Sequence, residues 1–532
     1  MVTVAMSEQD SLWLTMDRPN NLMVVDGALV MDGPLDLERV YAVLRRLHKR
    51  FPVFGRRAVR SGQGWAWQDD PDFSVERQVE IVDLPEPADM GELQAFMARQ
   101  RSVPLPLDRP RWSASVIPTL NLPDGTAGSA VLVRFHHAIA DGVRLTQVML
   151  GMCDSEEKAV AAVVARGLST PRAMTRRRVS LNPIRAARAM LASAGALATD
   201  TVVTSSSSLV AGATGLASVG ARAVVHPVQA VGDATQHALV APDRLGEAGA
   251  RWVEGGWERG LSVLRHPEHV LDALDALGIH NRGINDAGSV AKIVLTTTPR
   301  TVWTGKPTTH KALAWSQPVP LADVKAVGRA NECTVNDVLL AAIAGGVRNY
   351  LDKHNASVDQ VNWVVPINLK PFEDNLPPDL GNYFALVYLP MPLTGENLAE
   401  RLAHQQIAMG RIKHSDEAAM TFGVQRVVSR SPAQVAFFLT NFFANKAVGV
   451  LTNVPGPKHE VSFAGSPVRQ VIGFAPCSGD QPMTATIFSY NGGVTVGFAS
   501  DATLLPDPDV LADLVVDELN TMISEAIEGD VA

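Results

Sequence analysis

The chain has 532 residues, of which 46% are hydrophobic and 19% are charged, a composition typical of a globular protein. This length exceeds what one hydrophobic core usually serves, so we expect two large lobes or domains. The net charge of -8 argues against a nucleic-acid-binding protein, which would carry a basic domain or stripe. Three widely spaced cysteines indicate a reducing compartment, and they fit neither a disulfide framework nor a zinc site.

The first ten residues have no basic region and include two acidic residues, so they do not predict a secretory signal. No uninterrupted apolar stretch of the chain is long enough to span a bilayer. We therefore expect a cytoplasmic protein, and contact with a membrane surface is compatible with the sequence.

The N-terminal part predicts helices that alternate with strands. Asp36 stands where a helix N-cap belongs, apolar residues follow it at helical spacing, and Pro52 ends the helix. Other predicted elements are, in chain order, a helix at 7–14, a strand at 24–31, a helix at 90–100 and strands at 113–117 and 131–136.

The composition changes after residue 170. Six arginines lie between 172 and 188 with no acidic residue before Asp200, and 189–221 is mostly Ala, Ser, Gly, Thr, Val and Leu. One interpretation is a basic, weakly apolar arm that touches an anionic lipid surface. The other is a linker or a helical hairpin packed on the body, which is favoured because Ala and Ser bury little apolar area.

The C-terminal part again predicts strands and helices. Thr334 and Asp337 have the spacing of a capping box at the start of a helix, and Asn491-Gly492 between two apolar runs predicts a β-hairpin. The phenylalanine-rich stretch 435–443 fits core packing or the wall of an acyl-chain site. Further strands are predicted at 292–297, 313–316, 361–367 and 385–389, and an amphipathic helix after Pro508.

Two adjacent histidines, His136 and His137, end the apolar strand that begins at Val131, and Asp141-Gly142 follows them. Histidine is the side chain best suited to remove and return a proton near neutral pH. Neighbouring residues of an extended segment point to opposite sides, so a metal ion shared by both rings is disfavoured. We predict that one histidine faces a cavity and that the other is locked into the structure.

Asp141 can pin this loop through a salt bridge or orient an imidazole, and Gly142 would allow backbone or a ligand to pass close to the ring. The chain has no GxSxG elbow, no cysteine in an obvious catalytic motif and no phosphate-binding loop. A histidine base without a covalent nucleophile fits direct transfer, in which a deprotonated hydroxyl attacks an activated acyl group such as a thioester. The alternative is a pair of core histidines before a turn, and the following Asp-Gly favours catalysis over it.

The heptad His136-His137-Ala-Ile-Ala-Asp141-Gly142 resembles the HHxxxDG motif of the CoA-dependent acyltransferase superfamily, which includes peptide condensation domains. Further stretches resemble, in the same order, motifs of one of its families, the bacterial-type wax ester synthase/diacylglycerol acyltransferases. These stretches are 334–341 (the ND motif), 365–370 with Gly381-Asn382, 451–457 (the NVPGP motif) and 489–501. The segment 7–14 fits the same family, so the resemblance spans both ends of the chain.

The chain departs from the family pattern at Arg111, Asn368 and Thr452. Threonine keeps the hydroxyl of the serine that is common in the family, so these departures concern acceptor preference more than chemistry.

The resemblance implies an α/β fold with mixed sheets, in which two chloramphenicol-acetyltransferase-like lobes enclose a tunnel. We expect residues 1–180 to form the N-terminal lobe that carries HHxxxDG. Residues 181–289 would be an alanine-rich, partly helical connecting segment, and 290–532 the C-terminal lobe.

The resemblance also implies the site residues. His137 is the expected general base, His136, Asp141 and Gly142 complete the catalytic motif, and an arginine is expected to hold Asp141. The expected substrate-binding residues are Asn336, Asp337, Thr452, Asn453 and Trp112. Each has a structural alternative: helix capping for the Asn-Asp pair, a Pro-Gly turn for the Thr-Asn pair and core packing for the tryptophan.

The function implied is an acyl-CoA-dependent O-acyltransferase that moves a long-chain acyl group to diacylglycerol or a fatty alcohol. Acyl-CoA is the co-substrate, with no cofactor, no metal and no nucleic-acid partner. The expected location is cytoplasmic, at the inner face of the plasma membrane or at lipid bodies. Alternatives are an acyltransferase of the same fold for a polyketide, glycolipid or amine acceptor, and a catalytically silent lipid-binding protein.

Overall fold

The computed structural model describes residues 2–62, 64–153, 297–369, 376–413 and 433–531, and four single positions between 421 and 429. The alanine-rich segment 181–289, and the strand predicted at 292–297 apart from Thr297, lie outside these residues. All of the described residues belong to one compact unit made from residues 1–173 and 297–532.

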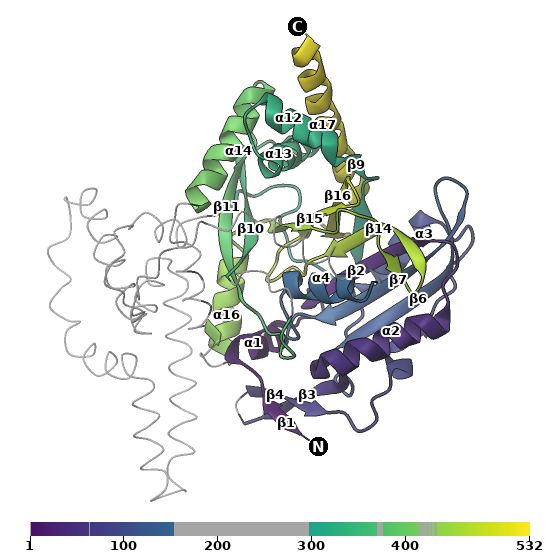
Figure 1. The fold of residues 1–532 in the computed structure, drawn as a ribbon. Helices are drawn as coiled ribbons and strands as arrows, with labels where there is room; N and C mark the ends of the chain where they lie inside the picture. Colours follow the sequence, from purple (N-terminus) through teal and green to yellow (C-terminus); the bar gives the residue numbers. More distant parts are fainter. Residues whose placement is uncertain are drawn as a thin grey trace, which may run out of the picture. The chain divides into compact units, whose positions relative to one another are not determined.

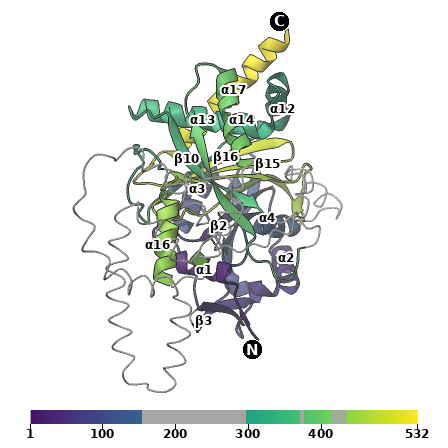
Figure 2. The ribbon, with the colours of Figure 1, turned by 90° about the vertical axis from the view of Figure 1, so that its left-hand side faces the viewer.

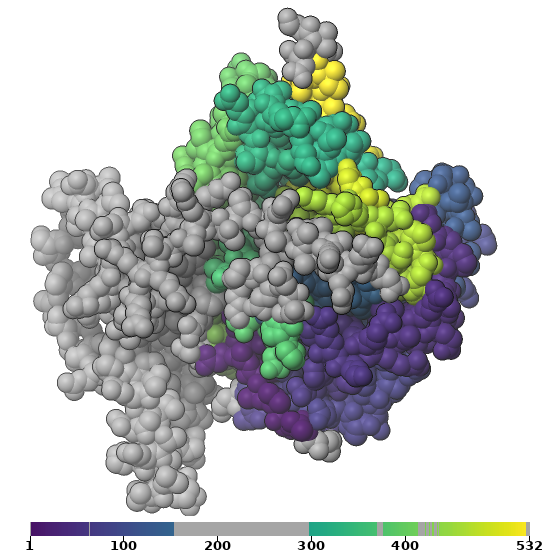
Figure 3. All heavy atoms as spheres, in the orientation of Figure 1, coloured from purple at the N-terminus to yellow at the C-terminus, as the bar shows by residue number. Residues whose placement is uncertain are grey.

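A six-stranded sheet carries the histidine strand. Its order is β13 (Ser462–Phe463), β14 (Ser466–Phe474), β2 (Val24–Asp32), β7 (Ala127–His136), β6 (Trp112–Asn121) and β5 (Val79–Ile81). Only β5 and β6 pair in parallel. The two C-terminal strands β13 and β14 complete this N-terminal sheet, and in Figure 3 their yellow-green atoms lie directly against purple and blue atoms.

Helices cover both faces of this sheet. The helix α3 (Met90–Gln100) packs Leu93 and Met97 into an apolar cluster with residues of β2 and β7. On the opposite face, α4 (Gly142–Gly151) brings Met149 so close to Gly27 of β2 that a Cβ at Gly27 would lie 2.7 Å from the methionine sulfur. The helix α2 (Leu37–Arg50) starts at Asp36, whose carboxylate accepts from two backbone N–H groups, as the sequence predicts.

A second, seven-stranded sheet is built from C-terminal residues. Its order is β11 (Phe384–Pro392), β10 (Gln360–Asn368), β12 (Gly449–Pro455), β15 (Met483–Tyr490), β16 (Gly493–Asp501) and β8 (Lys311–Trp315), with the short β9 (Val319–Pro320) also paired to β16. The predicted hairpin at Asn491-Gly492 is confirmed, because both residues have positive φ and join β15 to β16.

Four helices cover one face of the second sheet, as Figures 1 and 2 both show. They are α12 (Leu321–Ala330), α13 (Val335–Lys353), α14 (Leu398–Lys413) and α17 (Pro508–Val531). The apolar core between helices and sheet includes Ala485 and Ile487 of β15. The other face of the sheet meets the six-stranded sheet, where Ala499 and Trp315 join a cluster with Phe474 of β14. The mixed α/β fold class is therefore confirmed.

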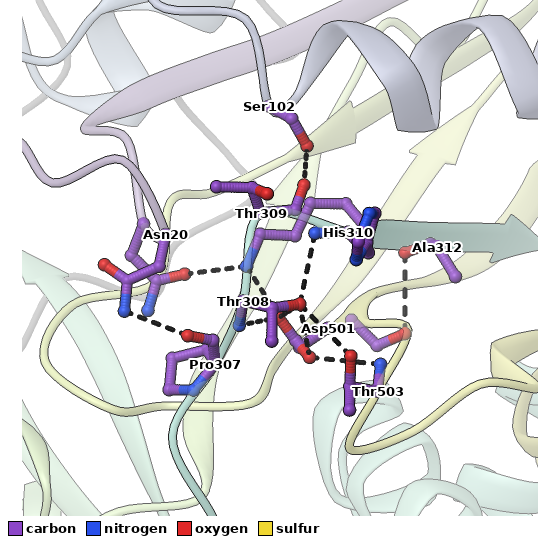
Figure 4. A network of polar contacts seen from close by, with 12 residues as sticks. Asn20, Ser102, Pro307, Thr308, Thr309, His310, Ala312, Asp501 and Thr503 are labelled. Carbon is purple, nitrogen blue, oxygen red and sulfur yellow. Dashed lines mark hydrogen bonds and ion pairs between the residues drawn. The ribbon is translucent and has the colours of Figure 1, made fainter.

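Polar contacts hold the segment before β8 against N-terminal residues (Figure 4). Asp501 accepts hydrogen bonds from the Thr308 backbone N–H at 2.5 Å and from Lys311 Nζ at 3.2 Å. Asn20 donates to the Pro307 carbonyl at 3.1 Å, and Ser102 donates to the Thr309 carbonyl. The Asp501 contacts lie within the C-terminal part, whereas those of Asn20 and Ser102 tie the segment before β8 to N-terminal residues.

A small sheet and two further helices lie beside the main sheets. The small sheet has the order β1 (Thr3–Ala5), β4 (Gly64–Asp69) and β3 (Arg56–Ser61). The predicted N-terminal helix is confirmed as α1 (Glu8–Met16), which contacts α16 (Ala433–Ala444), the phenylalanine-rich helix.

Candidate active site

The strand β7 delivers the two histidines to a loop that is fixed by backbone hydrogen bonds. The N–H of His136 donates to the Arg111 carbonyl at 3.0 Å, and the N–H of His137 donates to the Met23 carbonyl at 2.7 Å. The side chains then take different environments, as expected for adjacent residues at the end of a strand.

His136 is 0% exposed and both of its ring nitrogens are occupied. Its Nδ1 accepts from the Ala138 N–H at 3.1 Å, so the proton lies on Nε2, which donates to Asp17 Oδ2 at 3.1 Å. Arg111 donates to the same carboxylate oxygen at 2.7 Å. Burial lowers the pKa of His136, although Asp17 acts in the opposite direction. The buried and doubly bonded ring holds the loop in place, so His136 is the histidine that is locked into the structure.

His137 is 7% exposed and its ring packs against two aromatic side chains that also contact each other. The Trp13 indole of α1 stacks on it at 4.2 Å between ring centroids, and the Phe384 ring lies 5.4 Å away. Its Nδ1 lies 2.9 Å from Asn382 Oδ1. The imidazole is thus held by groups from both ends of the chain.

Asn382 determines which ring nitrogen of His137 carries the proton. Its amide nitrogen donates to Asp10 Oδ1 at 2.7 Å and to the His137 carbonyl at 2.9 Å. Its amide oxygen is therefore the group that faces Nδ1, and it can only accept, so Nδ1 is protonated. The lone pair lies on Nε2, to which no hydrogen bond is made within the described part of the chain.

Burial keeps His137 uncharged. It lowers the pKa of the imidazole from 6.5 to about 4, and the hydrogen bonds to the His137 backbone and to Asn382 oppose this only partly. Burial also raises the pKa of the Asp10 carboxyl, which the Asn382 amide lowers again. At neutral pH the ring is therefore a proton acceptor at Nε2 with a fixed orientation.

Asp141 joins the histidine loop to the C-terminal sheet. Its Oδ1 accepts from the Arg144 backbone N–H at 3.0 Å and caps α4, and its Oδ2 accepts from the Tyr383 N–H at 3.0 Å. Arg144 stacks over the Tyr383 ring at 4.4 Å and donates to the Leu380 carbonyl. The expected arginine is present beside Asp141, but the hydrogen bond that reaches the carboxylate comes from its backbone.

Gly142 is half-exposed and its φ is not positive. A Cβ built on it meets no atom within 4 Å. The expectation that it lets backbone pass close to the ring is wrong, and passage of a ligand is the interpretation that stays open.

The expected substrate-binding residues take several roles. Asp337 forms the capping box of α13 with Thr334, so its carboxylate is engaged in the helix terminus. Asn336 accepts a hydrogen bond from Asn453 Nδ2 at 3.0 Å, which brings the ND and NVPGP motifs together. Thr452 lies beside them on β12 and is half-exposed.

The expectation that Trp112 contacts substrate needs correction. Its indole is almost fully buried at the start of β6. The indole N–H donates to the Phe54 carbonyl at 2.8 Å, and the Phe54 ring packs edge-on at 5.9 Å. The side chain is part of the core of the N-terminal lobe.

Sequence reasoning missed Asp10, Trp13, Asp17 and Phe384 as parts of the site. Asp10 lies within the short helix α1 and Asp17 directly follows it, and the second half of this helix, from Leu12 to Met16, is mostly apolar. Acidic residues at positions that turn toward the core are the signal that could have found them, because a buried carboxylate needs partners.

Comparisons with known proteins agree with this architecture. Residues 6–248 match the model of the wax ester synthase/diacylglycerol acyltransferase catalytic domain, and residues 380–523 match the model of the WS/DGAT C-terminal domain. The chain belongs to this family. It is an O-acyltransferase.

Relatives and solved structures cover nearly the whole chain. A probable diacylglycerol O-acyltransferase of Mycobacterium tuberculosis is 24% identical over 526 residues, which cover 96% of this chain and 93% of the relative. The wax ester synthase/diacylglycerol acyltransferase of Marinobacter aquaeolei VT8 superimposes with a TM-score of 0.59 at 17% identity, covering 98% of this chain and 99% of that one. The first condensation domain of the calcium-dependent antibiotic synthetase gives 0.51 at 15% identity, covering 99% and 96%. Both structures share the two-lobe fold.

No group of three or more His, Cys, Asp or Glu side chains among the described residues is arranged to hold a metal ion. No helix within the same residues is both long and apolar enough to cross a membrane.

Replacement of Asn382 by alanine tests the orientation of His137. The ring would lose the acceptor that fixes Nδ1–H, so we expect kcat to fall about 10²-fold while the KM for acyl-CoA changes little. Release of free CoA measures both constants. Asn362→Ala is the matched control. This buried amide on β10 is hydrogen-bonded to Gln360 and to the Thr297 carbonyl and not to the histidine loop, so its loss should lower the thermal midpoint without changing kcat. An Asn382→Ala enzyme with wild-type kcat would contradict the assignment.

Proposed function

We propose that His137 acts as the general base in transfer of a long-chain acyl group from acyl-CoA to the hydroxyl of diacylglycerol or of a long-chain alcohol. The observation that supports this most strongly is the hydrogen bond between His137 Nδ1 and Asn382 Oδ1, because it leaves the lone pair on Nε2. Family membership supplies the reaction class, and this geometry supplies the group that removes the proton.

The reaction then proceeds by direct transfer. Nε2 takes the proton of the acceptor hydroxyl while the hydroxyl oxygen bonds to the thioester carbonyl carbon. The tetrahedral intermediate collapses, the carbon–sulfur bond breaks, and the departing CoA sulfur takes the proton from Nε2. An ester and free CoA are the products, and the imidazole returns to its starting tautomer.

The positive charge that His137 carries between the two proton transfers has a nearby stabilising group. Asn382 Oδ1 accepts from Nδ1–H throughout, and the Asp10 carboxyl oxygen accepts from the other end of the same amide. These two consecutive hydrogen bonds polarise the Asn382 amide so that its oxygen accepts more strongly from the ring. It favours the imidazolium when the proton arrives, whereas burial favours the neutral ring at rest.

Alanine at position 137 tests the base. His137→Ala should lower kcat about 10²- to 10⁴-fold, because the proton of the hydroxyl then has no acceptor in place. Release of free CoA with diacylglycerol, hexadecanol and an amine as separate acceptors measures the loss and identifies the preferred acceptor. An unchanged thermal midpoint serves as the folding control. Wild-type turnover by a folded variant would exclude His137 as the base.

We further propose that the protein works at the surface of a membrane or lipid body from the cytoplasmic side. Its acceptors and products are lipids, which reside in such surfaces. The helix α16 supports this, because its four phenylalanines are all partly exposed, and the Arg18 guanidinium lies 4.5 Å above the Phe437 ring. Aromatic side chains beside cations suit a lipid–water boundary.

Flotation with vesicles tests this location. We expect the protein to float with vesicles that contain anionic lipid, and the joint replacement of Phe437 and Phe438 by serine should lower the floated fraction severalfold. Phe73→Ser is the matched control, because this ring is also half-buried but packs at a tilt against His48, far from α16 in the sequence. Wild-type protein that stays in the dense fraction would contradict the proposal.

A further inference from the structure

Two threonines of β15 point away from the helix-covered core of the seven-stranded sheet. Side chains alternate between faces along a strand, and the neighbours Ala485 and Ile487 belong to that core. Thr484 and Thr486 therefore lie on the opposite, inner face. Ala499 pairs with Thr484 and joins the cluster of the six-stranded sheet, which confirms the direction of this face.

The hydroxyls of these two threonines are buried without a partner. Thr484 is 0% exposed and Thr486 is 5% exposed. Neither Oγ1 atom makes a hydrogen bond to any described residue. A hydroxyl that loses its hydrogen bonds to water on burial and gains none from the protein lowers the stability of the fold. Two such hydroxyls, two residues apart on one face of a strand, therefore call for a functional explanation.

A third hydroxyl completes the group. Thr452 of β12 pairs directly with Thr486 and shares its face. Thr452 and Val450 are half-exposed although β12 has strand neighbours on both sides. Thr452 is therefore the partly exposed member of the group, and the two buried threonines lie beside it on the next strand.

This inner face continues toward His137. Leu386 of β11 is half-exposed on the same face, and Phe384 at the start of that strand contacts the His137 ring. The strands β11 and β15 are three strand intervals apart, or about 14 Å in backbone spacing. An extended substrate that passes His137 would therefore run along the threonine hydroxyls.

We propose that Thr452, Thr484 and Thr486 form a subsite that donates hydrogen bonds to carbonyl oxygens of the bound substrate, and this rests on the proposed acyl transfer. The group that accepts these hydrogen bonds is expected to be uncharged, because the inner-face neighbours Val450, Gly497 and Ala499 are themselves uncharged and small or apolar. A hydroxyl among such residues suits an ester, thioester or amide carbonyl better than a phosphate, which would need cations. Such carbonyls occur in acyl-CoA and in diacylglycerol, but not in a fatty alcohol.

Valine replacements test the subsite in the full-length protein. We expect Thr484→Val and Thr486→Val each to raise the KM of one substrate, or to lower kcat, about tenfold, the loss of one hydrogen bond. The thermal midpoint should stay equal or rise, because valine removes an unpartnered hydroxyl. A change with diacylglycerol but not hexadecanol identifies acceptor esters. A change with both acceptors identifies the carbonyls of acyl-CoA.

Thr495→Val is the matched control. Thr495 lies on the same face of β16 and is buried, but its hydroxyl accepts from Gln470 at 3.3 Å. This variant should lower the thermal midpoint and leave KM and kcat unchanged. Kinetic constants within about twofold of wild type in both β15 variants, or losses equal to those of Thr495→Val, would overturn the subsite. Turnover by the wild-type enzyme and its loss in His137→Ala report separately on the proposed function.

Discussion

The hydrogen bond from His137 Nδ1 to Asn382 Oδ1 joins the two lobes at the point where chemistry is expected. One partner ends a strand of the N-terminal sheet, and the other precedes the edge strand of the C-terminal sheet. Additional contacts hold the same junction: Asp141 accepts from the Tyr383 N–H, and the Gly381 N–H donates to the Ile139 carbonyl. The orientation of the base therefore depends on the packing of the two lobes. A change anywhere in this junction should alter catalysis before it alters the fold.

The two adjacent histidines are both buried but have different roles. His136 is hydrogen-bonded at both ring nitrogens and ties the loop to Asp17 and Arg111, whereas the described residues bond His137 at Nδ1 only. Burial lowers the pKa of both imidazoles, so both are uncharged at neutral pH. In His136 burial accompanies a structural support, and in His137 it accompanies an uncharged ring whose lone pair is on Nε2. The same physical effect thus supports two different functions.

Local patterns in the sequence predicted the elements well, because capping residues and hairpin turns act within a few residues. The N-cap at Asp36 and the hairpin at Asn491-Gly492 are examples. The motif order also predicted the family and the fold class. Contacts between distant segments could not be predicted this way. The partner of His137 is 245 residues away in the sequence, and β14 joins the N-terminal sheet. The spacing of apolar residues within one segment carries no information about either contact. Trp112 shows the opposite error. Its place in a family motif suggested contact with substrate, whereas its side chain is almost fully buried and packs in the core.

The tautomer and titration of His137 test the account most directly. Nitrogen NMR of the protein labelled at histidine ring nitrogens, with His137→Gln for assignment, reports both. We expect Nδ1 to carry the proton and Nε2 to be bare at pH 7. Because the pKa is lowered to about 4, the ring should stay neutral as the pH falls through 6.5 and take up its second proton only near 4. A proton on Nε2 at neutral pH, or titration near 6.5, would contradict the central claim.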